Sequence, residues 1–561
     1  MQQVLNMVHK EIRGLHQAAY ILALFTFGSQ ILALIRDRLL AHEFGASIEL
    51  DLYYTAFRIP DFLYVLFAST LSVYVLIPFI SERIKGEDYT KARELLSQIF
   101  TLFIAGYVLI ASIAIVFAEP LVQFLFPGFE TYIDALVLLV RVLLLQPLLL
   151  GVSSLFGVVT QLKHRFILYA VGPIIYNIGI ILGLIFLYPI MGIIGLAYGV
   201  VLGALGHLCI QLPFVMGTKL APRVTRRIDM SEIGKVLGTS LTRALTLSLH
   251  QVILLALIGF ASIMTVGSVS VFQFAFNLQS VPLAIIGVSY SVAAFPFLAQ
   301  LFAEHKHEEF SASVSNALKH IFFWSLPVIA LFIVIRAQFV RVVLGSGEFD
   351  WDDTRLTAAV LALFVISLTA QAVHLLMTRA LYAVGNTRIP LLVTLFSSSL
   401  TLLTTFFFYM HFVVGSEFSQ TLIGIMRLEG VPGTEVLALS LGYTSAMLVH
   451  GVTILLVGHR KIYLSLKTLV RPLIQSFVAA LGAGFVSYVA LQYFVTIYTN
   501  ETLLGVFLQG FIAGAVGLVG YILMQALFRS RELSEVVQVC RKRLIRKEEM
   551  LAPQDEDHLA I

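Results

Sequence analysis

Cysteine and charge are both scarce in this chain. Its 561 residues include two cysteines, Cys209 and Cys540, which cannot supply a disulfide framework or a set of metal ligands. Charged residues make up 12% of the chain and hydrophobic residues 58%, with a mean hydropathy of +0.91. A water-soluble domain could not cover so much apolar surface. The composition therefore excludes a soluble globular protein and predicts a protein that lies mostly within a membrane.

Catalytic and nucleotide-binding motifs are also missing. The sequence has no phosphate-binding glycine loop with lysine, no paired cysteine or histidine motif, and no soluble stretch long enough for an ATP site. We therefore expect a protein that is not an enzyme and that uses no cofactor, no metal and no nucleic-acid partner. Any transport would be driven by an ion gradient, the membrane potential or the gradient of the substrate itself.

Long apolar runs are what the chain has in place of these features. Many exceed the roughly 20 residues that an α-helix needs to cross a bilayer, and they are too long and continuous for barrel strands. We predict an all-α polytopic membrane protein with about fourteen transmembrane helices. Their approximate limits are 16–35, 52–80, 94–118, 132–158, 166–188, 191–216, 236–262, 267–300, 320–344, 355–382, 389–413, 434–458, 472–494 and 502–528.

Lysine and arginine are concentrated in alternate connections between these spans. The connections 81–93, 217–235 and 459–471 are basic, whereas 119–131 and 495–501 contain no lysine or arginine. Because positive charge favours cytoplasmic loops, we expect both termini on the cytoplasmic side. The basic C-terminal tail would then face anionic lipid, although it would equally fit an ordinary solvated helix end.

The chain also shows signs of internal duplication. AFRIPDFLYVLFASTLSVYVLIPFI from Ala56 parallels AFNLQSVPLAIIGVSYSVAAFPFLA from Ala275, and a second pair of segments aligns Arg165 with Arg388 at a comparable offset. We therefore predict two six-helix lobes related by an internal repeat, as in transporters that alternate access around a central cavity. The predicted parts are an N-terminal lobe (1–216), a basic cytoplasmic linker (217–235), a C-terminal lobe (236–458), two additional helices (459–528) and a basic cytoplasmic tail (529–561).

Charged residues gather around the first two spans. Arg36 and Asp37 lie near the end of span one, and Asp51, Arg58 and Asp61 lie along span two. Ionisable groups in transmembrane segments are costly, which makes them candidates for a transport pathway. Arginine also suits contacts to phosphate. We predict that these five residues form a gate or contact a charged headgroup; an ion-pair network that only fixes the connection between two helices is the alternative.

Three further polar residues are weaker candidates for lining a cavity. Gln273 and Asn277 lie one helical turn apart in span eight, and Arg243 lies in span seven. Neighbouring helices can satisfy such groups without any transport role, so both interpretations stay open.

Several segments, taken jointly and in order, resemble one transporter family. They are IRDRLLAHEFGASIELDLYYTAFRIPDFL from Ile35, GPIIYNIGII from Gly172 and LYAVGNTRIP from Leu381. These segments are similar to the MurJ (MviN) family of lipid II flippases, in the multidrug, oligosaccharidyl-lipid and polysaccharide exporter superfamily. The resemblance implies alternating-access transport of lipid II for peptidoglycan synthesis in a bacterial cytoplasmic (inner) membrane. It also implies contacts with membrane lipids and cell-wall synthesis proteins, and a groove on the last two helices for a polyprenyl tail.

The chain departs from the family pattern inside the expected cavity. Where the family typically has further arginines, the counterparts here are Gln30, Tyr64 and Asn277. Such a cavity would hold a pyrophosphate-linked sugar less strongly. Two alternatives therefore stay open beside the flippase: an exporter of another amphiphile or a drug-like cation, and a transport-inactive scaffold for cell-wall enzymes.

Overall fold

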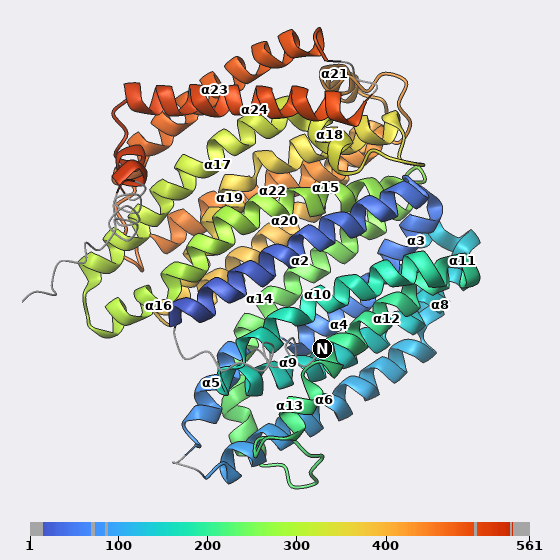
Figure 1. The fold of residues 1–561 in the computed structure, drawn as a ribbon, viewed down its shortest axis with the longest axis vertical. Helices are drawn as coiled ribbons and strands as arrows, with labels where there is room; N and C mark the ends of the chain where they lie inside the picture. Colours follow the sequence, from blue (N-terminus) through green and yellow to red (C-terminus); the bar gives the residue numbers. More distant parts are fainter. Residues whose placement is uncertain (1–14, 69–72, 85–87, 499–501, 539–540, 542–561) are drawn as a thin grey trace, which may run out of the picture. The chain divides into compact units, whose positions relative to one another are not determined.

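Every element in the described part of the chain is a helix. The computed structural model describes residues 15–68, 73–84, 88–498, 502–538 and 541 (Figure 1). The helices of the N-terminal half are α2 (Leu15–Phe44), α3 (Ile48–Ala56), α4 (Arg58–Ala68), α5 (Val73–Ser81), α6 (Thr90–Val116), α7 (Ala118–Leu125), η1 (Pro127–Tyr132), α8 (Ile133–Leu143), α9 (Leu145–Leu162), α10 (Phe166–Leu182), η2 (Gly183–Leu187), α11 (Tyr188–Met191), α12 (Ile193–Cys209) and α13 (Leu212–Met216).

The C-terminal half, from residue 230 onward, continues in the same way. Its helices are α14 (Met230–Ser262), α15 (Ser268–Leu283), η3 (Ala284–Val288), α16 (Ser289–Ala303), α17 (His307–Val343), α18 (Trp351–Ile366), α19 (Leu368–Ala383), α20 (Arg388–Val413), α21 (Glu417–Met426), η4 (Thr434–Val436), α22 (Leu437–Gly458), α23 (Lys467–Val495) and α24 (Leu503–Leu527). The predicted all-α membrane fold is thus confirmed.

The predicted number of fourteen spans is not confirmed. Within the described residues, 11 helices are long and apolar enough to cross a membrane, or 12 if the pair α18 and α19, interrupted at Ser367, is one span. These match the third to fourteenth predicted spans. The first predicted span falls on α2, and the second is divided among α3, α4 and α5, with residues 69–72 outside the described part. Pro60 lies in the first turn of α4, where its missing N–H breaks no helical hydrogen bond.

The packing separates the chain into two compact units, which we describe individually. Unit 1 comprises the residues up to Val281 together with Val340–Ser367 and Gly385–Thr453. Unit 2 comprises Pro282–Phe339, Leu368–Val384 and the residues from Ile454 onward. The division into two six-helix lobes, a linker, two extra helices and a tail remains a prediction.

Unit 1 contains a glycine contact that brings two helices together at backbone distance. α10 and α12 pack side by side (Figure 1). A Cβ atom added at Gly179 would lie 2.3 Å from the Cα of Gly203, and one added at Gly183 would lie 2.5 Å from the Cα of Gly199. Small residues four apart permit this close approach, which drives helix association in lipid.

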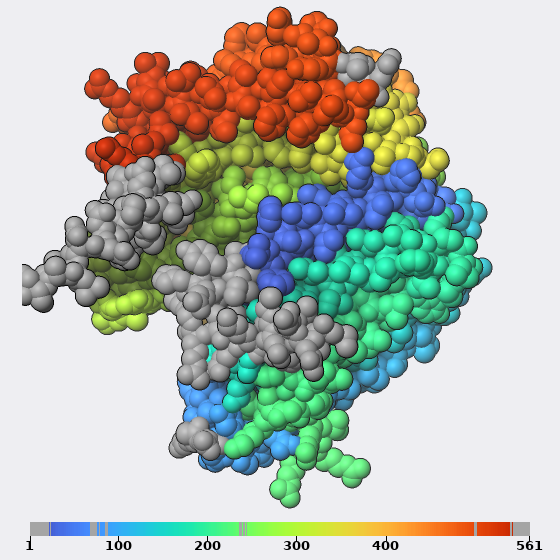
Figure 2. Space-filling view, in the orientation of Figure 1, coloured from blue at the N-terminus to red at the C-terminus, as the bar shows by residue number. Residues whose placement is uncertain are grey.

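Unit 2 is organised around the last two helices. α23 and α24 pack against each other, and the Tyr521 hydroxyl of α24 donates a hydrogen bond to the carbonyl of Phe323 in α17 at 2.6 Å. Much of their remaining surface, orange to red in Figure 2, is uncovered. Large apolar side chains on it are at least half exposed, including Phe477 at 51%, Phe485 at 69% and Phe511 at 62%. This surface is suited to contact with lipid tails.

Candidate functional site

The adjacent charges of α2 form the centre of a polar network in unit 1. The Arg36 guanidinium donates to one carboxylate oxygen of Asp37, from Nε at 3.0 Å and from Nη2 at 2.7 Å. Its Nη1 donates to Oδ1 of Asn177 in α10 at 3.0 Å. Asn177 in turn donates to Ser29 Oγ at 3.3 Å and to the Pro173 carbonyl at 3.0 Å. Arg36 is therefore held by α2 and α10 together.

The network continues from α2 into the C-terminal half. The Asn277 amide of α15 donates to the second oxygen of Asp37 at 2.9 Å, and Gln273 donates to Asn277 Oδ1 at 2.6 Å. The Arg58 guanidinium of α4 then donates to Gln273 Oε1. These contacts form one continuous hydrogen-bonded chain, which we call the polar relay. Its members are Asn177, Arg36, Asp37, Asn277, Gln273 and Arg58.

The aromatic face of α15 fixes the direction of the two amides. Phe272 and Phe276 lie one turn apart and both contact the Phe364 ring, with centroid separations of 5.3 and 5.8 Å. Because residues at i and i+1 differ by about 100° around a helix, Gln273 and Asn277 lie on the next face. Burial of the phenylalanines on α18 thus turns the amides toward α2 and α4.

Arg58 and Asp61 lie one turn apart at the start of α4. Arg58 is 8% exposed, and its Nε has no hydrogen-bond partner within the described structure. Asp61 is half-buried and contributes no side-chain hydrogen bond to the relay. A buried guanidinium with an unused donor is costly, so this position retains capacity for another acceptor.

Asp51 occupies a different place from the other predicted charges. It is 2% exposed, and its carboxylate accepts from Gly267 N at 2.7 Å, Ser270 N at 2.8 Å and Ser270 Oγ at 2.6 Å. Asp51 therefore caps the N-terminus of α15, where a negative charge complements the helix dipole. Of the five predicted residues, Arg36, Asp37 and Arg58 thus belong to the relay, Asp51 forms this cap, and Asp61 belongs to neither.

Near the Asp51 cap, other contacts within unit 1 also join the N-terminal half of the chain to the C-terminal half. Arg38 donates to the carbonyl of Val342 at 2.6 Å, and Asp353 accepts from Ala46 N at 3.0 Å. Gly267 has φ of +92°, and a Cβ there would lie 2.4 Å from the Ala46 carbonyl oxygen. A side chain would separate these backbones, so glycine permits the contact. The charge pattern of the sequence predicts this end to be the outer one.

The remaining predicted residues do not join the relay. Gln30 is exposed on α2. The Tyr64 hydroxyl lies 3.3 Å from Ser154 Oγ of α9. Arg243 belongs to α14, but its side chain lies outside the described part of the structure.

Sequence reasoning missed Asn177 and Ser270. Asn177 is 6% exposed in an otherwise apolar helix, and its isolation within the run FILYAVGPIIYNIGIIL was the available signal. Ser270 gave no comparable signal, because its partner Asp51 is 219 residues away. Among the described residues, no group of three or more histidine, cysteine, aspartate or glutamate side chains could hold a metal ion.

A bundle of long apolar helices, containing a partly buried chain of charged and amide groups from both halves of the chain, is the architecture expected of a polytopic membrane transporter. The family model described as lipid II flippase MurJ matches residues 40–508. The chain belongs to the MurJ family.

Individual relatives agree with this assignment. The lipid II flippase MurJ of Burkholderia cenocepacia is 24% identical over 395 residues, which cover 68% of this chain and 76% of that protein. A relative from Buchnera aphidicola subsp. Baizongia pistaciae, named "Probable lipid II flippase MurJ", is 26% identical over 398 residues, covering 70% of this chain and 77% of the relative.

Solved structures share the fold. A lipid II flippase MurJ in an inward closed conformation has a TM-score of 0.71 at 20% identity, covering 91% of this chain and 98% of that one. An inward-facing multidrug resistance transporter of the MATE family has a TM-score of 0.62 at 15% identity, covering 77% of this chain and 94% of that one. At these identities the likeness concerns the fold alone.

Proposed function

We propose that this protein is a flippase that carries lipid II, a lipid-linked peptidoglycan precursor, across the bacterial cytoplasmic membrane. The observation that carries this proposal is the MurJ family match, which extends over residues 40–508. In this proposal the protein is not an enzyme, both termini are cytoplasmic, and the cargo moves from the cytoplasmic to the outer leaflet. Cell-wall synthesis proteins are its natural partners.

The proposed mechanism is alternating access between the two halves of the chain. Asp51 and Arg38 hold the predicted outer end of unit 1 closed through the start of α15 and the end of α17. The polar relay also joins the halves. Opening the outer end must break these contacts. Their net strength therefore sets the equilibrium between the closed and the open state of the outer end.

Arg36 is the member of the relay best suited to meet the headgroup. Its side chain is 20% exposed, whereas that of its partner Asp37 is 5% exposed. Guanidinium groups can bind phosphate through two parallel hydrogen bonds. The Nη1 and Nη2 donors of Arg36, which could make such a pair, here donate to Asn177 and to Asp37. A phosphate that binds Arg36 would compete with these partners and loosen the relay, which couples cargo binding to motion.

Complementation tests this function directly. The chain would be expressed in a bacterium depleted of its own lipid II flippase, with membrane levels confirmed, and survival and outer-leaflet lipid II would be measured. We expect rescue by the wild-type chain and loss of rescue with Arg36→Gln at equal membrane levels. Failure of the well-inserted wild-type chain, together with no binding of lipid II by the purified protein, would refute the assignment of cargo.

A second candidate follows from the neutral side chains at three positions that the sequence predicts to line the cavity. Gln30, Tyr64 and Asn277 carry no charge, while Asp37 and Asp61 remain acidic. A site with neutral and acidic side chains at these positions also suits another amphiphile or a drug-like cation. Competition between lipid II and a lipophilic cation for the purified protein separates the two candidates, because only the second predicts tighter binding of the cation.

A further inference from the structure

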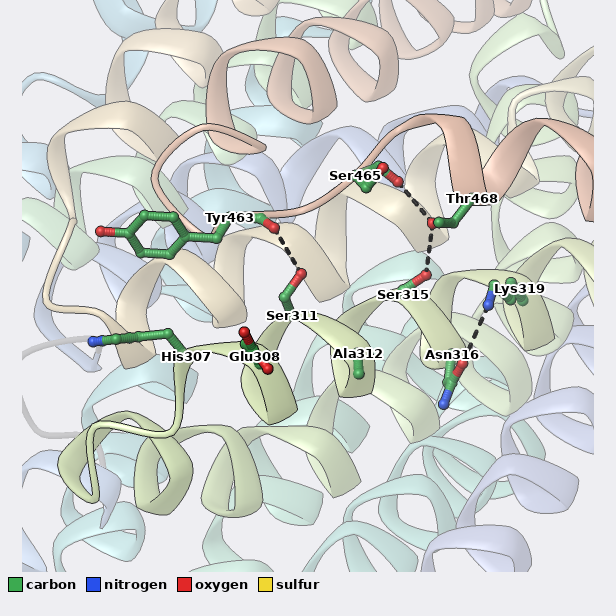
Figure 3. Close-up of a pocket in the computed structure, with 10 residues that line it drawn as sticks. All are labelled: His307, Glu308, Ser311, Ala312, Ser315, Asn316, Lys319, Tyr463, Ser465 and Thr468. Atoms are coloured by element: carbon green, nitrogen blue, oxygen red, sulfur yellow. Dashed lines mark hydrogen bonds between the residues drawn. The ribbon is translucent and has the colours of Figure 1, made fainter.

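Unit 2 contains a pocket of about 470 Å³ that is remote in sequence from the relay (Figure 3). Its walls come from the first turns of α17 and from the segment that leads into α23. The lining residues are His307, Glu308, Ser311, Ala312, Ser315, Asn316, Lys319, Tyr463, Ser465 and Thr468.

Two hydrogen bonds hold these walls together. Ser311 Oγ donates to the Tyr463 carbonyl at 2.8 Å, and Ser315 Oγ lies 3.2 Å from Thr468 Oγ1 (Figure 3). Both join α17 to the segment before or at the start of α23. The pocket is therefore a built concavity between two connected elements, with hydroxyl groups along its length.

The two ends of the pocket carry opposite charges. Glu308 lies at one end beside His307 and Tyr463, and Lys319 lies at the other end beside Asn316 (Figure 3). The Lys319 ammonium donates to Asn316 Oδ1 at 3.3 Å, and within the described residues neither Lys319 nor Glu308 has an ion-pair partner. Eleven residues separate their backbones by about 16 Å along the helix. Lysine side chains lean toward the helix N-terminus, which brings the ammonium toward Ser315.

The order of these groups matches the order of groups in a membrane lipid. Lys319 lies on the side of the apolar part of α17, whereas Glu308 and His307 lie at its polar beginning. Beyond Thr468, exposed apolar side chains follow on α23, with Val470 at 52% and Ile474 at 56%, and the exposed Arg471 lies between them. Acyl chains along α23 would thus place a lipid phosphate near Lys319 and the end of its headgroup near Glu308.

We propose that this pocket binds the headgroup of a phosphoethanolamine lipid. The phosphate would accept hydrogen bonds from Lys319, Ser315 and Thr468. The headgroup ammonium would be attracted to the Glu308 carboxylate and to the face of the Tyr463 ring. The exposed basic residues nearby, such as Lys461, attract any anionic lipid without selecting a headgroup, so Glu308 is the group that confers selectivity. The site is independent of the transported cargo.

Lipid titration of the purified, delipidated full chain tests this proposal. Binding of phosphatidylethanolamine and phosphatidylglycerol would be followed by native mass spectrometry, with thermal melting as a second measurement. We expect the wild type to bind phosphatidylethanolamine at least several-fold more tightly. Lys319→Gln should weaken both lipids, whereas Glu308→Gln should weaken phosphatidylethanolamine alone and remove the preference.

Neighbouring residues outside the pocket provide matched controls. Glu309→Gln and Lys461→Gln remove the same charges from exposed positions and should leave the preference unchanged. Equal binding of both lipids by the wild type, or an unchanged preference in Glu308→Gln, would overturn the proposal. Binding of soluble phosphoethanolamine as tightly as phosphatidylethanolamine would also overturn it, because the acyl chains would then contribute nothing and the site would be one for the free headgroup.

Discussion

Replacing Asp51 with alanine should open the predicted outer end of the protein without unfolding it. The carboxylate accepts three buried hydrogen bonds from the start of α15. A net contribution of about 1 kcal/mol for each gives roughly 3 kcal/mol in favour of the closed contact. Because a tenfold change corresponds to about 1.4 kcal/mol, Asp51→Ala should shift the equilibrium toward the open state by about 100-fold.

Cysteine labelling measures this shift. Ser268 is 1% exposed, and its hydroxyl has no hydrogen-bond partner within the described residues, so Ser268→Cys is a mild change at a buried position near the cap. This introduced cysteine is the reporter, and it would be placed in a chain whose Cys209 and Cys540 are replaced by serine. An impermeant maleimide added from outside should label the reporter slowly in the wild-type background and up to about 100-fold faster with Asp51→Ala.

The control is another aspartate with the same local role. Asp229 caps α14 and accepts from Ser231 N at 2.9 Å and Glu232 N at 3.2 Å, so its helix-capping bonds stay within one helix. Asp229→Ala should leave the labelling rate unchanged. If Asp51→Ala labels no faster than this control, or if it merely lowers the melting temperature to the same extent, the closing role of Asp51 is refuted.

Three further outcomes are expected. Gly199→Ala should lower the melting temperature in detergent more than Gly234→Ala, because the new Cβ would lie 2.5 Å from the Gly183 Cα in η2, whereas the space beside Gly234 is open. Arg36→Lys should reduce lipid II transport at least tenfold in a proteoliposome assay, since an ammonium cannot reproduce the planar contacts to two partners. Asn277→Asp should impair transport more than Asn277→Ser in complementation, because it sets a second carboxylate against Asp37.

The fold could be predicted from the sequence because each span carries its own signal. Apolar runs of more than 20 residues specify helices locally, and the helices from α6 onward overlap the predicted spans. The main differences are that α17 begins at His307 rather than at 320 and that the tenth span is divided at Ser367. The second span could not be matched in this way, because the helix is interrupted between α3 and α4 at Phe57, just before Pro60, and because residues 69–72 lie outside the described part. Runs of apolar residues do not reveal such a break, since its cause is local backbone geometry rather than hydrophobicity.

The candidate site could be predicted only in part. Arg36 and Asp37 were placed together because they are neighbours in the chain, and Gln273 and Asn277 because they lie one turn apart. Their connection through Asp37 spans 240 residues and depends on how α2 and α15 pack. The role of Asp51 could not be predicted for the same reason. Its charge is evident in the sequence, but its role as a cap depends on where α15 packs.

The charge of the relay constrains how it can serve a phosphate-bearing cargo. Arg36 and Arg58 contribute two positive charges, and Asp37 and the nearby Asp61 contribute two negative ones, so the set is neutral overall. A neutral set offers a pyrophosphate little net attraction while Arg36 remains bound to Asp37. Affinity must then arise when the arginine exchanges partners, and Asn277, which already donates to Asp37, can compensate the released carboxylate. In the proposed mechanism, the neutral amide at this position allows cargo binding and rearrangement of the relay to occur together, and the expected loss of transport in Asn277→Asp would measure that dependence.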